Sequence, residues 1–339
     1  MTDERCFFRK GSPQAHGAHR NLCQSGCPSF EGWRPGVKML LLSTLLTLGA
    51  ATPLAALQTR PADAAAPAAQ EIVVEGQRSP KETIDAFVRE LTPARIGGQL
   101  GRFEDPLCPV ALGMGDNENR LVRDRLRQVA AAVGMATAGE HCAPNLYVLV
   151  GRDKKEVIHG LDEQFPALMS GVSRNQMRDL ADTAGPAVSW QILDRIGADG
   201  MPLAMAKMGA DAQPVRVVRS IGSPSRIQQQ TKVKFVATLI VVEARALKGV
   251  TTRQLADYAA MRTFAATGAT VGALPAKSIL SLFDDGAAPG EAPASVTWWD
   301  FAFLKSLYAS SGALTASSQR GEMNRIVAKE LSKVPQEER

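Results

Sequence analysis

Histidine is the residue type that most often supplies a general base or a zinc ligand near neutral pH. Beyond residue 64 the sequence contains only two histidines, His141 and His159. Two imidazoles cannot complete a three-histidine zinc site, but either could activate a serine, or act beside an aspartate, in a hydrolase. The alternative is that both are ordinary surface or core histidines, and the residues favour a non-catalytic protein over an enzyme.

The common motifs for nucleophile or phosphate chemistry are missing. No G-x-S-x-G turn, no G-x-x-x-x-G-K-[ST] loop and no G-x-G-x-x-G motif occurs in the sequence. The basic and amide-rich stretch SRIQQQTKVKF (225–235) has no aromatic residues between its charges, unlike surfaces that bind single-stranded nucleic acid. We therefore predict neither a cofactor nor a nucleic-acid partner.

An export signal is the clearest feature of the N-terminal part. Two basic residues, Arg34 and Lys38, precede the apolar run that follows Met39, and Ala62–Ala64 has the A-x-A cleavage pattern. This order predicts a signal peptide over residues 39–64 and export across the inner membrane of a Gram-negative bacterium into the periplasm. A retained anchor is the alternative, but the strongly apolar part, Met39–Leu48, is about half of the roughly 20 residues that span a membrane. We expect no membrane span after cleavage.

Residues 1–38 do not fit in front of such a signal, because they are polar, rich in turn-forming residues and without any period. We interpret them as a spurious or disordered extension, with translation starting near Met39. The alternative is a metal-binding tract, since C-x3-C spacing occurs there. Its ligands would be Cys6, His16, His19, Cys23 and Cys27.

Most of the positive charge belongs to this N-terminal part. Residues 1–64 hold seven of the 39 Lys and Arg residues and four of the 34 Asp and Glu residues, so the formal charge falls from +5 to about +2 beyond them. The basic pI is thus no argument for nucleic-acid binding.

Two cysteines, Cys108 and Cys142, remain beyond residue 64. In an oxidising compartment an isolated pair without further Cys or His partners indicates a disulfide. Such a bond closing about 35 residues stabilises a fold by roughly 3–4 kcal/mol in the chain-entropy estimate. The alternative is two unrelated buried thiols.

Residues 65–80 are predicted to be a linker with a short strand at Ile72–Val74, and residues 81–335 a single α/β domain, in which helices flank a mixed sheet. A helix over Glu118–Val133 places its apolar residues on one face, whereas Leu146–Gly151 is a short buried strand followed by a helix through residue 165. Val233–Glu243 is too apolar on both faces to lie at a solvated sheet edge.

Helix signals continue after this strand. Thr251 and Gln254 form a capping box that starts a helix, which Gly268 and Gly272 are expected to end. Thr297 and Asp300 start another, and Ala316–Leu331 is a final amphipathic helix.

This C-terminal half resembles metzincin-type zinc peptidases and the secreted bacterial families related to them. In that family a strand leads into a helix with H-E-x-x-H-x-x-G-x-x-H, followed by an S-I-M turn and a helix with Asp near its start and Leu-Tyr near its end. Here Ser278-Ile279-Leu280 stands at the turn position, and Asp300 and Leu307-Tyr308 match the last helix. The resemblance covers about a quarter of the chain and implies a zincin-like fold.

The zinc ligands of the family are absent at the matching positions. Arg253 stands for the first His, Gln254 for the general-base Glu, Asp257 for the second His and Thr263 for the third. A guanidinium repels Zn²⁺ and an amide is no base, so we expect no metal and a degenerate domain. Arg253 and Asp257, spaced i,i+4, are expected to pair on the helix surface.

Trp298 and Trp299, at the start of a helix, could form a stacking surface for a sugar or peptide, or one could pack inward while the other lies at the rim. The favoured interpretation is a non-catalytic periplasmic binding or envelope protein, whose partner is another envelope protein or a peptide. The alternative is a periplasmic hydrolase using His141 or His159 with a Ser or Asp.

We predict that the mature protein begins near residue 65, because the small residues Ala62 and Ala64 flank the cleavage position. Intact-mass measurement of protein from the periplasmic fraction checks this. A mass that retains Leu40–Leu48 would contradict cleavage.

Overall fold

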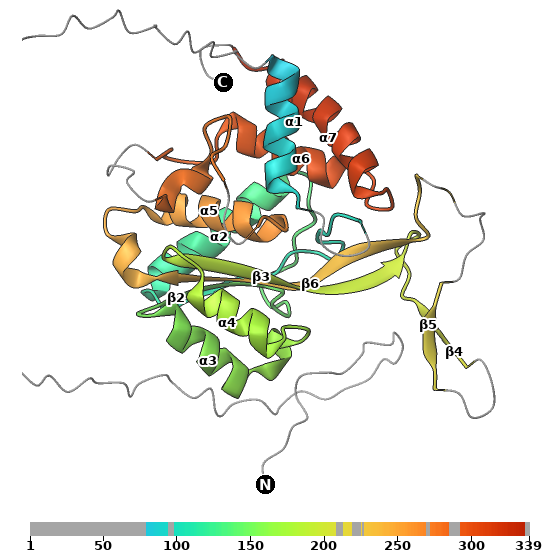
Figure 1. Cartoon of the computed structure of the whole chain (residues 1–339). Helices are drawn as coiled ribbons and strands as arrows, with labels where there is room; N and C mark the ends of the chain where they lie inside the picture. Colours follow the sequence, from blue (N-terminus) through green and yellow to red (C-terminus); the bar gives the residue numbers. More distant parts are fainter. Residues whose placement is uncertain are drawn as a thin grey trace, which may run out of the picture. The chain divides into compact units, whose positions relative to one another are not determined.

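The computed structural model describes residues 79–93, 98–207, 213–218, 225, 227–268, 272–284 and 292–335 (Figure 1). These residues belong to one compact unit, Val73–Arg339. The N-terminal extension, the signal peptide and the strand expected at Ile72–Val74 lie outside the described residues.

A four-stranded mixed sheet forms the centre, and this confirms the expected fold class. Its strand order is β1 (Pro109–Leu112), β2 (Leu146–Gly151), β6 (Thr231–Glu243) and β3 (Ala187–Gly197). The first three strands are parallel, and β3 pairs antiparallel with β6. The register of β3 and β6 shifts at Ile192/Leu193, which leaves Val236 exposed. A separate two-stranded sheet joins β4 (Ala204–Ala206) to β5 (Val215–Val217).

Helices cover both faces of the sheet (Figure 1). On one face Ile240 and Val242 of β6 join the larger core, and on the other Leu239 and Val241 join a smaller one. The second half of β6, from residue 237 to residue 243, is therefore buried on both faces, as its sequence predicts, whereas the first half is only partly buried. The larger core is built with α1 (Pro80–Leu91), α2 (Asp116–Ala132), α5 (Thr252–Phe264), α6 (Trp298–Ala309) and α7 (Ala316–Leu331), and the smaller with α3 (Lys154–Gln164) and α4 (Arg174–Asp182).

Short 3₁₀ helices connect several elements: Pro166–Met169, Ala244–Leu247 and Ile279–Phe283. Among the described residues, no helix combines the length and the apolar composition that crossing a membrane requires.

Both predicted capping boxes are present. Thr251 Oγ1 accepts from the Gln254 amide at 3.1 Å, and Thr297 Oγ1 accepts from the Asp300 amide at 3.1 Å. The predicted end of α5 at the glycines is wrong, because the helix stops at Phe264. The Tyr308 hydroxyl donates to the Phe264 carbonyl at 2.7 Å, so a tertiary contact satisfies one of the last-turn acceptors that every helix leaves open.

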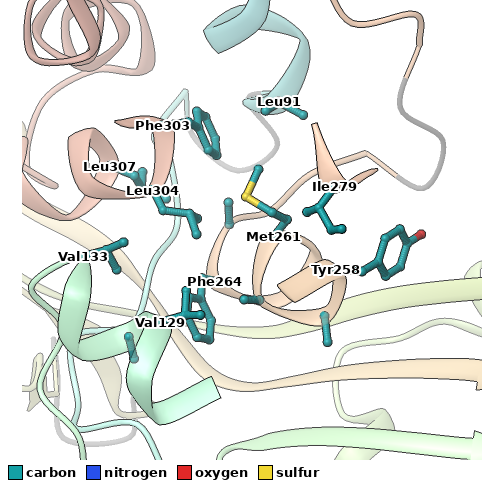
Figure 2. Close-up of a cluster of buried hydrophobic side chains, with 14 of the residues drawn as sticks. Leu91, Val129, Val133, Tyr258, Met261, Phe264, Ile279, Phe303, Leu304 and Leu307 are labelled. Atoms are coloured by element: carbon teal, nitrogen blue, oxygen red, sulfur yellow. The ribbon is translucent and has the colours of Figure 1, made fainter. Parts of the chain in front are cut away.

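Helix α5 is the most enclosed element, since every residue from Leu255 to Phe264 is buried. Figure 2 shows Met261 and Phe264 of α5 in one cluster with Val129 of α2 and Leu304 of α6. A helix buried on all sides has no solvent face on which a long charged side chain can be placed freely.

The predicted disulfide between Cys108 and Cys142 is confirmed. Their Cα atoms are 6.0 Å apart, within the usual range of about 4.4–6.8 Å. The bond joins the residue before β1 to the loop before β2, and backbone hydrogen bonds from Leu107 to Ala136 and from Asn145 to Cys108 hold the same two segments together.

Candidate functional site

The first two positions of the sequence resemblance, Arg253 and Gln254, lie at the N-terminal end of α5. Arg253 is exposed. Gln254 is held on both sides of its amide: its Oε1 accepts from the Thr251 backbone at 3.1 Å, and its Nε2 donates to the Pro293 carbonyl at 3.1 Å. Gln254 therefore joins the start of the helix to the segment before α6.

Asp257, one turn further along, is fully buried. Arg125 of α2 donates to both of its oxygens, from Nε at 2.7 Å and from Nη2 at 3.1 Å. The Ser295 hydroxyl and the Val296 amide also donate to Asp257 Oδ2, at 2.7 and 2.9 Å. The carboxylate thus accepts four hydrogen bonds, two of them from a bidentate guanidinium, which is the strongest form of such a pair.

The predicted surface pair of Arg253 and Asp257 is therefore wrong. Asp257 faces α2 and the segment before α6, whereas Arg253 lies at the exposed start of the helix. The reason is that α5 packs against α2 along this side, and a carboxylate buried there needs a cation from the facing helix.

Thr263, at the third ligand position, is also fully buried. Its hydroxyl donates to the Ala259 carbonyl of the same helix at 2.6 Å. The positions that match the family's ligands therefore do not converge on one point: one is exposed, one is in an ion pair and one is turned into its own helix.

The remaining motif residues do meet. The buried Asp300 of α6 accepts from the Ser278 hydroxyl at 2.5 Å, from the Ile279 amide at 2.8 Å and from the Thr297 amide at 3.0 Å. Burial is the largest influence on Asp300 and raises the pKa of its carboxyl, against the opposing effect of these donors. The carboxyl ties the 278–280 turn to the start of α6.

Both histidines are exposed, His141 in the loop before β2 and His159 on α3. Among the described residues no hydroxyl or carboxylate hydrogen-bonds either imidazole, and no cluster of three or more His, Cys, Asp or Glu side chains could hold a metal ion. The structure does not bring the two histidines together with the degenerate helix.

The adjacent residues Trp298 and Trp299 line two different cavities, a pocket and a groove. Trp298 is 45% exposed and meets Phe301 edge-on at 6.2 Å between ring centroids. With Glu330, Lys333, Val334 and Pro335 these rings line a pocket of about 270 Å³, which we call the Trp298 pocket. Lys305 lies over the Phe301 ring at 5.4 Å and pairs with Glu330 at 3.1 Å.

Trp299 turns inward, and the centroid of its ring lies 5.3 Å from that of Phe87 of α1. Its other edge lines an open groove of about 740 Å³, formed by residues 272–278, 280, 281 and 284 with Pro293. This groove comes from irregular segments, and its residues carry no periodic pattern that would have identified it in the sequence.

Sequence reasoning also missed Arg125, the partner of Asp257. One signal was present: Arg125 directly borders the apolar face formed by Val122, Leu126 and Val129 of α2, all buried. A basic residue beside a core-facing stripe is placed to meet an acidic residue on the helix that covers it.

Comparisons with protein families, with curated proteins and with solved structures find no match to this chain. Its chemistry is therefore interpreted from the contacts above.

We predict that Asp257→Ala lowers the free energy of unfolding by about 3 kcal/mol, because it leaves the partly buried Arg125 guanidinium without its anion. Arg253→Ala, on the same helix but exposed, should change it by less than about 0.5 kcal/mol. Urea unfolding of both variants measures the difference. Equal effects of the two substitutions would contradict this account of the ion pair.

Proposed function

We propose that this protein is an exported periplasmic protein that binds a partner without catalysis, on a scaffold that resembles a zincin-like domain without its zinc site. The observation that carries the proposal is the state of Asp257, the one residue of the degenerate helix that could coordinate a metal. Both of its carboxylate oxygens already accept hydrogen bonds, which come from Arg125, Ser295 and Val296.

A zinc ion at this helix would have to approach the Arg125 guanidinium closely. Two unit charges 4 Å apart interact by about 4 kcal/mol at an effective dielectric constant of 20, and a divalent ion about doubles this repulsion. Asp257 could bind the metal only by giving up its bidentate partner. Binding of a metal ion by Asp257 would therefore require the Arg125–Asp257 ion pair to break.

The zincin-like part of the proposal is supported by the order and contacts of four elements. Strand β6 leads through a short 3₁₀ helix into α5, the 278–280 turn follows, and α6 comes next. Ser278 contacts Asp300, and Tyr308 near the end of α6 contacts the end of α5. These contacts use the residues on which the sequence resemblance is based.

Export is supported by the Cys108–Cys142 disulfide, because such bonds persist in oxidising compartments. The exposed positions of His141 and His159 do not favour the alternative hydrolase. The Trp298 pocket is the preferred place for a peptide or another envelope protein, since exposed tryptophan beside charged groups is common in binding surfaces.

We expect protein that has been purified and dialysed against zinc-free buffer to contain no stoichiometric zinc, because the Asp257 carboxylate is already bound by Arg125. Elemental analysis measures the metal content, with Arg253→Ala as a control that leaves Asp257 paired. Stoichiometric zinc in the wild type that is lost in Asp257→Ala would restore a metalloenzyme and refute the proposal.

We further expect a photo-crosslinking residue placed at Trp298 in cells to yield a discrete adduct. The same residue placed at Leu121 of α2, which is also 45% exposed, is the matched control and should yield none. Mass spectrometry of the adducts identifies the partner. Identical adducts at both positions, or none at Trp298, would argue against a binding role for the Trp298 pocket.

A further inference from the structure

The Trp298 pocket lies where the start of α6 meets the end of α7, two helices that pack against each other (Figure 1). Trp298 is the first residue of α6, and Phe301 lies about one turn further on. The turn after α7 forms another wall, and it is held by a hydrogen bond from the Val334 amide to the Leu331 carbonyl at 3.2 Å. The residues of this lining all lie in the described part of the chain.

The pocket has the size of a site for one side chain. Its volume of about 270 Å³ is below the roughly 300–1,000 Å³ of pockets that enclose a drug-sized ligand. Its apolar walls are the exposed ring of Trp298, the edge-on ring of Phe301, and Val334 with Pro335. An apolar side chain placed here would cover the indole ring, and removing apolar surface from water is favourable.

Three charged side chains at the pocket leave an excess of one positive charge. Glu330 pairs with Lys333 at 2.8 Å and with Lys305 at 3.1 Å. The hydrogen bond from Lys333, and then that from Lys305, lowers the pKa of the Glu330 carboxyl, which is therefore ionised at neutral pH. Two ammonium groups and one carboxylate sum to a charge of +1. One further carboxylate would neutralise this group.

The hydrogen-bonding capacity at the pocket also favours an anion. An ammonium group has three donors and no acceptor. Within the described residues Lys333 Nζ gives one hydrogen bond, to Glu330, and its side chain is 54% exposed. Glu330 accepts from both lysines. The groups that face a ligand are therefore donors with a positive charge, and such donors make their strongest hydrogen bonds to carboxylates.

We propose that the Trp298 pocket binds the C-terminal residue of a peptide chain, with an apolar side chain in the pocket and the terminal carboxylate on Lys333 and Lys305. A C-terminal residue carries both groups on one Cα atom. Successive side chains of an extended chain point to opposite sides, so an acidic residue next to an internal apolar residue would point away from the lysines. This inference rests on the proposed function, because it names the chemistry of the partner.

The test is fluorescence anisotropy of a labelled peptide, Gly-Ser-Gly-Ser-Leu, titrated with the purified chain. The peptide is made with a free terminal carboxylate and with a terminal amide. We expect the amide form to bind roughly tenfold more weakly, because it loses the charge-assisted hydrogen bonds. A free-acid peptide that ends in serine should also bind more weakly, because it lacks the apolar side chain.

Variants separate the two parts of the site. Lys333→Gln should weaken binding of the free acid about threefold to fivefold and leave binding of the amide unchanged. Lys329→Gln removes the same charge from an exposed position on α7 and should bind both peptides like the wild type. Trp298→Ala should weaken both peptides, whereas Leu121→Ala, at a residue that is also 45% exposed, should weaken neither. Circular dichroism establishes that all variants are folded.

Equal binding of the free-acid and amide peptides, or no binding of the free acid, would overturn the proposal. Equal losses in Lys333→Gln and Lys329→Gln would do the same. Self-association in sedimentation velocity that Trp298→Ala abolishes would also contradict it, because that result assigns the pocket to a second copy of the chain. If the peptides fail but crosslinking at Trp298 yields a discrete adduct, only the terminal carboxylate is rejected and the proposed binding role stands. Without an adduct, both are rejected.

Discussion

The buried ion pair between Asp257 and Arg125 is the constraint on which the C-terminal half of the fold depends. A buried carboxylate is costly unless its oxygens accept hydrogen bonds, and Asp257 takes its donors from two separate parts of the chain, α2 and the segment just before α6. Ser295 and Val296 are thereby held against α5, and Thr297 follows them directly as the N-cap of α6. The helix that starts at this cap has Trp298 on its exposed side and Trp299 against Phe87.

Most helices and strands with a regular spacing of apolar residues, or with a clear N-terminal capping motif, could be predicted from the sequence. The buried face of α2, strand β2, strand β6, both capping boxes and α7 all follow from spacing alone. Strand β3 and the short strands β1, β4 and β5 lacked such a signal. The predicted end of α5 was wrong for a different reason: the helix ends at Phe264 before any glycine, and the Phe264 carbonyl accepts from the hydroxyl of Tyr308, 44 positions away, a contact that no local pattern shows.

The candidate site was less predictable than the fold because its contacts join distant residues. Asp257 and Arg125 are 132 positions apart, whereas the i,i+4 rule considers only neighbours on one helix. Nearly all of α5 is buried, so its sequence has no polar face to show which side carries the ion pair. The residue types alone predicted the chemistry of these positions: Arg253 has a guanidinium and Gln254 an amide, and neither group can bind a metal ion as a histidine does.

The disulfide has a consequence for the stability of these parts. Cys108 and Cys142 lie on either side of α2, so the bond turns β1, α2 and the following loop into a covalent ring that carries Arg125. Closing that ring restricts the unfolded chain, and in the folded chain it holds the two ends of the segment that carries Arg125 6.0 Å apart at their Cα atoms. Reduction of the two cysteines therefore releases the ends of the segment whose arginine neutralises the buried carboxylate, which links the stability of the core to the redox state of its surroundings.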